Sequence, residues 1–474
     1  MSSPVQVNSF ISGAFTPSTG QSVVESLNPS VPAEVVAVLT VGTAQDVDQA
    51  VDSAEKGFSS WKSLSGPARG DHLYAWADRV KARSEDLAQA IAREVGKPIG
   101  EAMGEVGRCV AILRYYAGEA VRPMGEVIPA QIGSALQYSL RSPLGVVGLV
   151  TPWNFPLAIP LWKAAPAIAV GNTVVLKPSE LSPLCAMLLA ETSIGLPEGV
   201  FNVVPGDGST GASLVNHSGV KAVSFTGSVK TGTSIQEACA RANRKCQCEM
   251  GGKNAAVVLE DADMKKAAGL VAAGAIRFAG QKCTATSRAI VVENAYEAFL
   301  SELKSAFDAL PVAPVTEANS ALGPVIDQSS QSRLMATLEG SRNRTLHQAS
   351  GSVGGYFVPP TIVGPVNASD PIAQEELFGP VLAIITAKHF DHAVELANST
   401  PFGLSTALYT SNIPNALAYI DRIEAGLVRI NGDTTGVDPH APFGGTKASS
   451  SGTREQGEVA KDFYTEWKTV QVNP

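Results

Sequence analysis

The 474-residue sequence has only six cysteines, and no two of them form a CxxC pair. Secreted domains that depend on disulfides are much richer in cysteine, so this content indicates a reducing compartment. The first 20 residues are polar and contain no apolar signal-peptide core. We therefore expect a cytoplasmic protein. Cys246 and Cys248 have no histidine or further cysteine beside them, and we expect no metal site.

Long apolar runs and basic clusters are also missing. The longest apolar runs, such as 144–150 and 164–170, fall far short of the about 20 residues that a membrane-spanning helix needs. The 36 basic and 44 acidic residues give a formal net charge of −8, and lysine and arginine form no block. Proteins that bind nucleic acid or anionic lipid usually concentrate basic residues. We expect neither nucleic acid nor membrane as a partner.

What the sequence does contain is an alternation of strand-like apolar runs with helical segments. The first set of runs lies at 144–151, 173–176, 200–204, 222–225 and 255–259, with helices expected over 181–193 and 211–217. The second set lies at 289–292, 379–385, 406–409 and 426–431, with helices expected over 296–310 and 392–398. Such alternation implies parallel sheets with right-handed crossovers, covered on both faces. The fold class is therefore α/β, with a second α/β domain starting near Lys253.

Other segments lie outside this alternation. The N-terminal 60 residues predict short strands followed by a helix over 46–61, and residues 67–121 predict two long amphipathic helices. Gln131–Arg141 and Glu466–Val472 alternate as strands do but fit neither domain. A terminal strand of this kind can pair with the edge of another chain, or it can form a local sheet edge.

Two segments could bind a dinucleotide. Gly206 opens a GxGxxG motif between an expected strand and an expected helix, but the usual acidic residue about 20 positions later is missing. The motif thus indicates either an unusual cofactor site or only a tight turn. Lys177, Ser179 and Glu180 follow the strand at 173–176, where they could bind a ribose. The alternative is a solvated strand end in which Glu180 suits a helix dipole.

Three residues could carry covalent chemistry. Cys283 stands beside Lys282, and an adjacent cation with free backbone amides predicts a lowered thiol pKa; the alternative is a small buried hydrophobe. Glu249 lies in an apolar strand, where desolvation raises a carboxyl pKa and suits a general base; the alternative is a salt bridge. Asn154 lies between two prolines and could donate to an oxyanion or simply form a turn.

Taken together, seven segments resemble the aldehyde dehydrogenase superfamily in order and spacing. They are TPWNFP at 151–156, VVLKPSE at 174–180, FTGSVKTG at 225–232, EMGGKN at 249–254, GQKC at 280–283, EELFGP at 375–380 and PFGG at 442–445. The resemblance implies a Rossmann-like cofactor domain (1–122 and 143–252) and a catalytic domain (253–444). It also implies an oligomerisation arm with a C-terminal strand (123–142 and 445–474), and hence a homodimer or homotetramer.

The resemblance implies roles for single residues. The implied catalytic residues are Cys283 as nucleophile, Glu249 as general base, Asn154 as oxyanion donor beside the Cys283 backbone amide, and Lys177. Three of the implied cofactor contacts, Lys177, Ser179 and Glu180, are placed near the adenosine ribose, and Ser228 is placed at the pyrophosphate. Glu376 and Phe378 are implied contacts of the nicotinamide ribose and ring. Further implied contacts of the cofactor are Thr151, Trp153, Gly206, Gly227, Met250 and Gly251.

The implied reaction is oxidation of an aldehyde to a carboxylic acid through a thioester on Cys283. Relatives that transfer the acyl group to CoA typically lack the glutamate, so Glu249 favours hydrolysis. Glu180 favours NAD because a carboxylate repels a 2′-phosphate, whereas Lys177 and Ser179 can bind that phosphate. We therefore expect NAD and NADP both to serve.

The substrate is indicated by residues near the nucleophile. Arg277 resembles the arginine that binds the substrate carboxylate in succinic semialdehyde dehydrogenases; the alternative is a surface arginine in a salt bridge. Trp162 stands where that group has a second arginine. The segments 280–288 and 431–457 most resemble 2-oxoglutarate semialdehyde (2,5-dioxopentanoate) dehydrogenases. A semialdehyde with a distal carboxylate is therefore expected. The alternatives are an aromatic or neutral aldehyde, with Trp162 and Phe443 as substrate contacts, or a non-catalytic structural protein.

Overall fold

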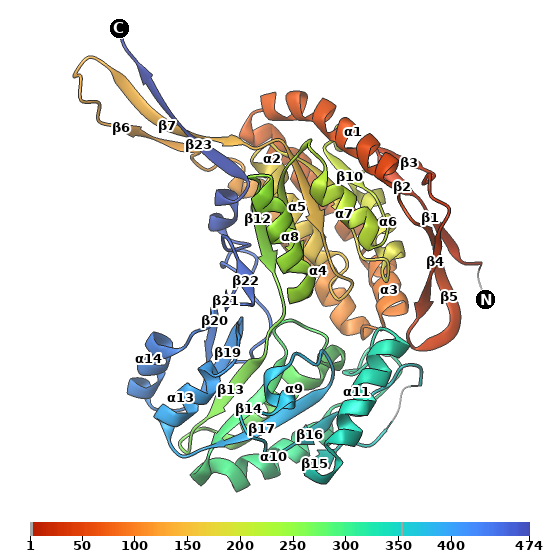
Figure 1. Ribbon diagram of the computed structural model, residues 1–474, viewed down its shortest axis with the longest axis vertical. Coiled ribbons are helices and arrows are strands. Elements are labelled where there is room, and N and C mark those ends of the chain that lie inside the picture. The colour runs from red at the N-terminus through yellow and green to blue at the C-terminus, as the bar shows by residue number, and fades with distance from the viewer. Residues whose placement is uncertain (1–2, 352–353) are drawn as a thin grey trace.

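The computed structural model describes residues 3–351 and 354–474, which form two α/β parts and a projecting β arm (Figure 1). At the N-terminus, as expected, short strands precede a helix. The strands are β1 (Val5–Val7), β2 (Ser9–Ile11), β3 (Ala14–Thr16), β4 (Val23–Asn28) and β5 (Val31–Thr40), and the helix is α1 (Ala44–Ser63). Thr43 and Asp46 form a capping box at the start of α1, so its first turn is fixed by its own sequence.

Residues 66–119 form three helices, and the prediction of two was wrong. They are α2 (Gly66–Ala82), α3 (Ser84–Val95) and α4 (Ile99–Glu119). The chain leaves helical geometry at Arg83, and Gly96 ends α3 in the left-handed conformation with φ +67°. Pro98 then precedes α4. These breaks fold α3 and α4 against each other, and α4 packs on α2.

The first large sheet has eight strands in the order β22-β12-β11-β8-β9-β10-β2-β3. Its parallel strands are β8 (Val146–Val150), β9 (Thr173–Lys177), β10 (Phe201–Val203), β11 (Val220–Thr226) and β12 (Lys245–Glu249), with β22 (Ser450–Ser451) antiparallel at the edge. Its helices are α5 (Ala158–Ala169), α6 (Pro183–Ser193), α7 (Gly208–Asn216) and α8 (Val229–Arg241). The predicted alternation and parallel pairing are confirmed.

The second large sheet has seven strands in the order β15-β16-β17-β14-β13-β19-β20. The strands are β13 (Asn254–Val258), β14 (Thr286–Val292), β15 (Thr345–Gln348), β16 (Thr361–Val363), β17 (Val381–Ala387), β19 (Ser405–Tyr409) and β20 (Leu427–Ile430). The helices are α9 (Met264–Ile276), α10 (Tyr296–Ala309), α11 (Gln328–Gly340), α12 (Pro371–Gln374), α13 (Phe390–Asn398) and α14 (Ile413–Arg422); β18 (Phe402–Gly403) and β21 (Thr446–Lys447) form a small separate sheet. The chain passes from the first sheet to the second between β12 and β13.

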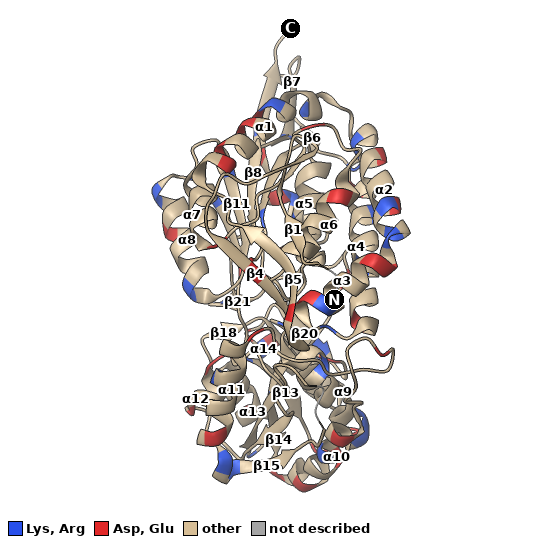
Figure 2. Cartoon of the chain, turned by 90° about the vertical axis from the view of Figure 1, so that its right-hand side faces the viewer, with Lys and Arg blue, Asp and Glu red and all other residues tan. Residues whose placement is uncertain are grey.

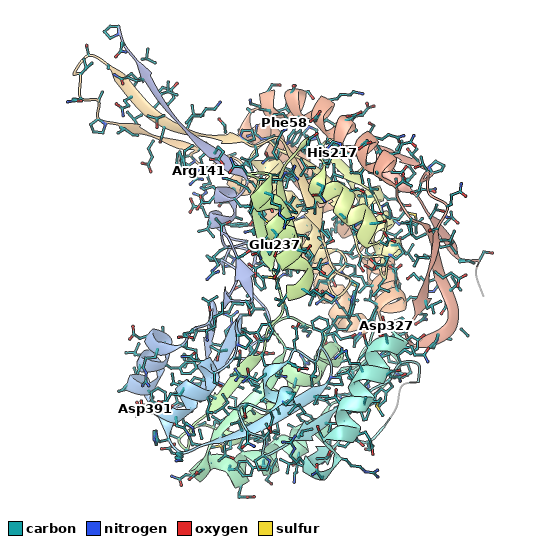
Figure 3. All side chains as sticks on the ribbon, in the orientation of Figure 1. Phe58, Arg141, His217, Glu237, Asp327 and Asp391 are labelled. Carbon is teal, nitrogen blue, oxygen red and sulfur yellow. The ribbon has the colours of Figure 1, made fainter. Side chains whose placement is uncertain are left out.

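The arm is a three-stranded sheet in the order β23-β7-β6 that projects from the body (Figure 1). Its strands are β6 (Gly125–Ile128), β7 (Leu136–Pro143) and β23 (Thr465–Val472). The C-terminal strand thus pairs with β7 of its own chain, from Thr465 opposite Pro143 to Val472 opposite Leu136. Arg141 lies at the base of the arm (Figure 3). It pairs with Asp462, and its guanidinium carbon lies 4.1 Å from the Trp467 ring centroid.

Charge is spread over the surface of both parts. Figure 2 shows acidic and basic residues interspersed along the outer helices. No helix within the described residues combines the length and apolar character needed to cross a bilayer.

Candidate active site

A cleft of about 530 Å³ opens where β8, β9 and β11 end, at the carboxyl edge of the first sheet. Ligands bind at this edge in open α/β sheets. The structure places most of the predicted cofactor residues in its lining: Thr151, Trp153, Lys177, Ser179, Glu180, Gly227 and Ser228. Helices α7 and α8 supply the remaining wall.

The cleft carries a paired cation and carboxylate at the end of β9. The Lys177 ammonium lies 3.3 Å from a Glu180 carboxylate oxygen, and burial lowers the pKa of Lys177 while Glu180 raises it. Glu180 keeps 38% of its side chain exposed, whereas Lys177 is buried. A half-exposed carboxylate can accept two hydroxyl donors, so this pair suits a ribose.

Gly206 lies outside the lining of the cleft, unlike the other predicted cofactor residues of this part. A Cβ at Gly206 would lie 2.1 Å from the Thr210 hydroxyl, and Asp207 caps α7 by accepting from the Ser209 amide at 2.8 Å. Gly206 is thus a tight-turn glycine. Gly208 and Gly211 line the cleft instead.

The N-terminus of one helix and two threonine hydroxyls face the same cleft. Ser228 is the N-cap of α8 and accepts from the Thr231 amide at 3.3 Å, so the positive end of this helix faces the cleft. The hydroxyls of Thr151 and Thr226 are buried and have no hydrogen-bond partner in the part of the chain that the structure describes. A helix N-terminus binds phosphate, and free hydroxyls can bind its oxygens. The residues present therefore fit a dinucleotide.

A second cavity of about 280 Å³ continues from this cleft and shares Trp153, Thr226, Gly227 and Ser228 with it. It brings together residues that lie far apart in the sequence, namely Asn154, Met250, Gly251, Cys283, Glu376 and Phe378. Glu376 accepts from the Gly252 amide at 3.0 Å, and burial raises its pKa to about 7. The Phe378 ring lies 5.7 Å from Trp153, edge to face.

Cys283 lies between α9 and β14, after a turn in which Phe278, Ala279 and Gly280 all have positive φ. The expectation of a lowered thiol pKa was wrong. Burial and the charges of Glu376 and Glu249 raise the pKa of Cys283 to about 12. Lys282 does not counter this, because its ammonium pairs with Glu101 at 2.8 Å. The resting thiol is therefore protonated at neutral pH.

Glu249 is the last residue of β12 and is buried. One carboxylate oxygen accepts from the Ser450 hydroxyl at 2.6 Å, and the other has no hydrogen-bond partner among the described residues. Burial, and next the charge of Glu455, raise the pKa of Glu249 well above its usual value, as predicted. A desolvated carboxylate with one free oxygen can accept a proton from water.

Asn154 is held at the end of β8 by a buried network. Its side-chain NH₂ donates to the Gln281 carbonyl at 3.0 Å, and its backbone carbonyl accepts from the Lys97 ammonium at 2.7 Å. Lys97 pairs with Glu105, which also accepts from the Leu157 amide at 3.0 Å. One amide hydrogen of Asn154 remains for an oxyanion.

Comparison with known proteins decides the family. The model of the aldehyde dehydrogenase family matches residues 15–470. The chain belongs to this family. It is 44% identical to the α-ketoglutaric semialdehyde dehydrogenase of Bacillus subtilis over 98% of each chain. It is 40% identical to the α-ketoglutarate semialdehyde dehydrogenase of Haloferax volcanii, over 97% of this chain and 98% of the relative. The structure of the NAD-dependent aldehyde dehydrogenase of Sinorhizobium meliloti superposes with a TM-score of 0.95 at 35% identity, covering 99% of this chain and 95% of the other.

The predicted resemblance and fold class are confirmed, and the chain is an aldehyde dehydrogenase. This aldehyde dehydrogenase has charged groups near Glu249 that sequence reasoning missed. Lys163 and Glu455 form a completely buried ion pair, and Lys163 also donates to the Ser224 hydroxyl at 2.9 Å. The sequence did contain a sign that Lys163 has a special environment, because Lys163 is the one charged residue in the otherwise apolar helix α5.

In this aldehyde dehydrogenase Cys283 also lies near two aromatic rings that line neither the cofactor cleft nor the 280 Å³ cavity. The rings of Trp162 and Phe443 are 5.4 Å apart, and Cys283 packs against the small apolar cluster that contains Phe443. Both predicted aromatic substrate contacts therefore lie together. Arg277, at the end of α9, is exposed, as the surface alternative expects, but it forms no ion pair with the residues that the structure describes.

Proposed function

We propose that this aldehyde dehydrogenase oxidises 2-oxoglutarate semialdehyde, or a similar semialdehyde with a distal carboxylate, to the carboxylic acid by using NAD or NADP. The observation that carries the reaction type is the cavity that joins Cys283 and Asn154 to the dinucleotide cleft, with Glu249 near enough for its charge to raise the thiol pKa. The names of the Bacillus and Haloferax relatives support the substrate, and that of the Sinorhizobium neighbour supports NAD.

The test compares kcat/KM for 2-oxoglutarate semialdehyde with that for pentanal, a neutral aldehyde of equal carbon number, with saturating NAD. The proposal expects the carboxylated aldehyde to be preferred by at least about tenfold. Preference for pentanal or benzaldehyde would instead support the second candidate, a dehydrogenase of neutral or aromatic aldehydes. The Trp162–Phe443 pair is the observation that favours this second candidate.

In the proposed mechanism, the Cys283 sulfur adds to the aldehyde carbon and its proton is released to solvent water. The free amide hydrogen of Asn154 and the Cys283 backbone amide stabilise the resulting oxyanion. The nicotinamide cofactor, when bound, supplies the hydride acceptor that allows the oxyanion to collapse to a thioester. Glu249 then takes a proton from water, the water attacks the thioester carbon, and Cys283 leaves with a proton as the acid is released.

The cofactor proposal predicts the effect of removing one charge. Glu180→Gln is expected to raise kcat/KM for NADP by roughly tenfold, because the carboxylate no longer repels the 2′-phosphate beside Lys177. The value for NAD should fall by a few fold. The control is Glu237→Gln on α8 (Figure 3), where the carboxylate pairs with exposed Arg241. A wild-type NAD/NADP ratio beyond about a thousandfold, ~4 kcal/mol, would contradict dual use.

Arg277 is proposed to attract the distal carboxylate. Arg277→Ala is expected to lower kcat/KM for 2-oxoglutarate semialdehyde about tenfold and leave pentanal unchanged, because only the charged substrate uses the guanidinium. The side chain is exposed, so solvent keeps the effect small. Steady-state kinetics with both aldehydes measure it, with exposed Arg342→Ala as the control. Equal losses on both aldehydes would give Arg277 a structural role only.

We further infer a homodimer or homotetramer built on the arm. The arm exposes apolar side chains that a solitary sheet would leave in water: Val127, Ile132, Leu136, Trp467 and Val472.

All six cysteines are free, which supports a reducing compartment such as the cytoplasm.

A further inference from the structure

Arg108 is a cation without an ion-pair partner in the part of the chain that the structure describes. It lies on α4, is partly buried, and forms no ion pair within residues 3–351 and 354–474. The other arginine of this helix, Arg114, pairs with Asp78 at the surface. Sequence reasoning gave Arg108 no role, because it lies in an amphipathic helix far from every motif.

The guanidinium of Arg108 lies on the aromatic side of Cys283. Its central carbon is 5.8 Å from the ring centroid of Trp162, and the Trp162 ring is 5.4 Å from that of Phe443. Phe443 in turn belongs to the cluster that packs against Cys283. Contacts therefore run from Cys283 through the Phe443 cluster and Trp162 to Arg108, and an extended aldehyde that followed these rings from Cys283 would bring its far end to Arg108.

The guanidinium is fixed on one side and free on the other. Nη2 donates to the Gln456 side-chain oxygen at 3.1 Å, and the Trp162 ring supports the cation. Nε is buried and has no hydrogen-bond partner among the described residues, whereas Nη1, which has none there either, is not buried. Donors that are already oriented bind a carboxylate with little loss of entropy.

The electrostatic surroundings favour an anion at this place. Burial lowers the pKa of Arg108, and the opposing effects of Asp438 and Glu105 come from carboxylates that do not contact the guanidinium. A desolvated cation without a counterion is destabilising, and an incoming carboxylate removes that penalty. A neutral aldehyde leaves that penalty in place.

We propose that Arg108 binds the distal carboxylate of the substrate and supplies the cation that is missing at Trp162. This inference rests on the proposed function, since it requires a substrate with a carboxylate. It assigns Arg108 a specificity role and no part in the covalent steps. Arg277 is exposed and, within the described residues, makes no cation–π contact with Trp162 or Phe443, so Arg108 contributes more than Arg277.

The test uses the 474-residue chain with Arg108→Met, which keeps an unbranched apolar stem and removes the charge, and Arg108→Lys, which keeps the charge. Arg114→Met on the same helix is the matched control. The kcat/KM of Arg108→Met for 2-oxoglutarate semialdehyde should fall roughly 10- to 150-fold, mainly through KM. The value for pentanal should stay within about threefold. Arg108→Lys should retain part of the preference, and Arg114→Met all of it.

The outcomes separate the two proposals. If the wild-type enzyme shows no preference for the carboxylated aldehyde, the proposed substrate class is wrong. If it shows the preference but Arg108→Met keeps it, or loses activity equally on both aldehydes, the assignment of Arg108 is wrong and the substrate class stands. Should Arg108→Met not fold, as judged by its melting temperature, Arg108→Gln, which also removes the charge, decides: a kcat/KM for the carboxylated aldehyde within about threefold of the wild-type value would overturn the assignment.

Discussion

Cys283→Ala is expected to lower aldehyde oxidation at least about a thousandfold while the cofactor still binds. The loss should be this large because the thiol forms the covalent intermediate, and no other cysteine lines the 280 Å³ cavity. Steady-state NADH formation measures the activity, and quenching of tryptophan fluorescence by NADH measures binding, since Trp153 lines both the cavity and the cleft.

The control for this variant is Cys246→Ala. Cys246 is the other cysteine that is not fully buried, and it lies on β12 away from the cavity lining. The Cys246→Ala variant should retain most of the aldehyde-oxidising activity. Steady turnover of Cys283→Ala above about a thousandth of the wild-type rate would contradict the assignment of Cys283 as nucleophile.

Glu249→Gln is expected to slow thioester hydrolysis roughly 100-fold or more and to affect hydride transfer much less. The amide cannot accept a proton from water, whereas addition and collapse at Cys283 still have Asn154 as the oxyanion donor. Rapid mixing should therefore show a burst of NADH, close to one per active site, followed by slow turnover. Glu237→Gln serves as the control, because that carboxylate lies on exposed α8.

The pH dependence provides a second readout of the same residue. Burial and Glu455 raise the pKa of Glu249, so at low pH the carboxyl group is protonated and cannot act as a base. Hydrolysis in the wild type should rise with pH as this raised pKa is passed, and Glu249→Gln should lose that dependence. A normal burst and a normal steady rate in the variant would show that another group is the base.

Much of the fold could be predicted because parallel strands leave a plain signature. Apolar runs such as 173–176 and 222–225 became central strands, and the alternating segments near 136 and 466 became paired strands of the arm. The break between α2 and α3 could not be seen, because Arg83 and Ser84 are compatible with a helix and only packing separates the two axes.

The site was predicted where its residues stand in motifs, and missed where it depends on contacts across the chain. Cys283, Asn154 and Glu376 come together in one cavity. The thiol pKa was misjudged because proximity in sequence does not set electrostatics: Lys282 turns to Glu101, while the carboxylate of Glu376 faces Cys283 from another element. Arg108 was missed for the same reason.

The measurement that tests the central claim most directly is the intact mass of Glu249→Gln quenched in acid after mixing with 2-oxoglutarate semialdehyde and NAD. The account predicts that the protein gains the mass of the aldehyde less two hydrogens, that peptide mapping places this acyl group on Cys283, and that its amount equals the NADH burst. NADH formation without an adduct, or with an adduct on another cysteine, would contradict the account.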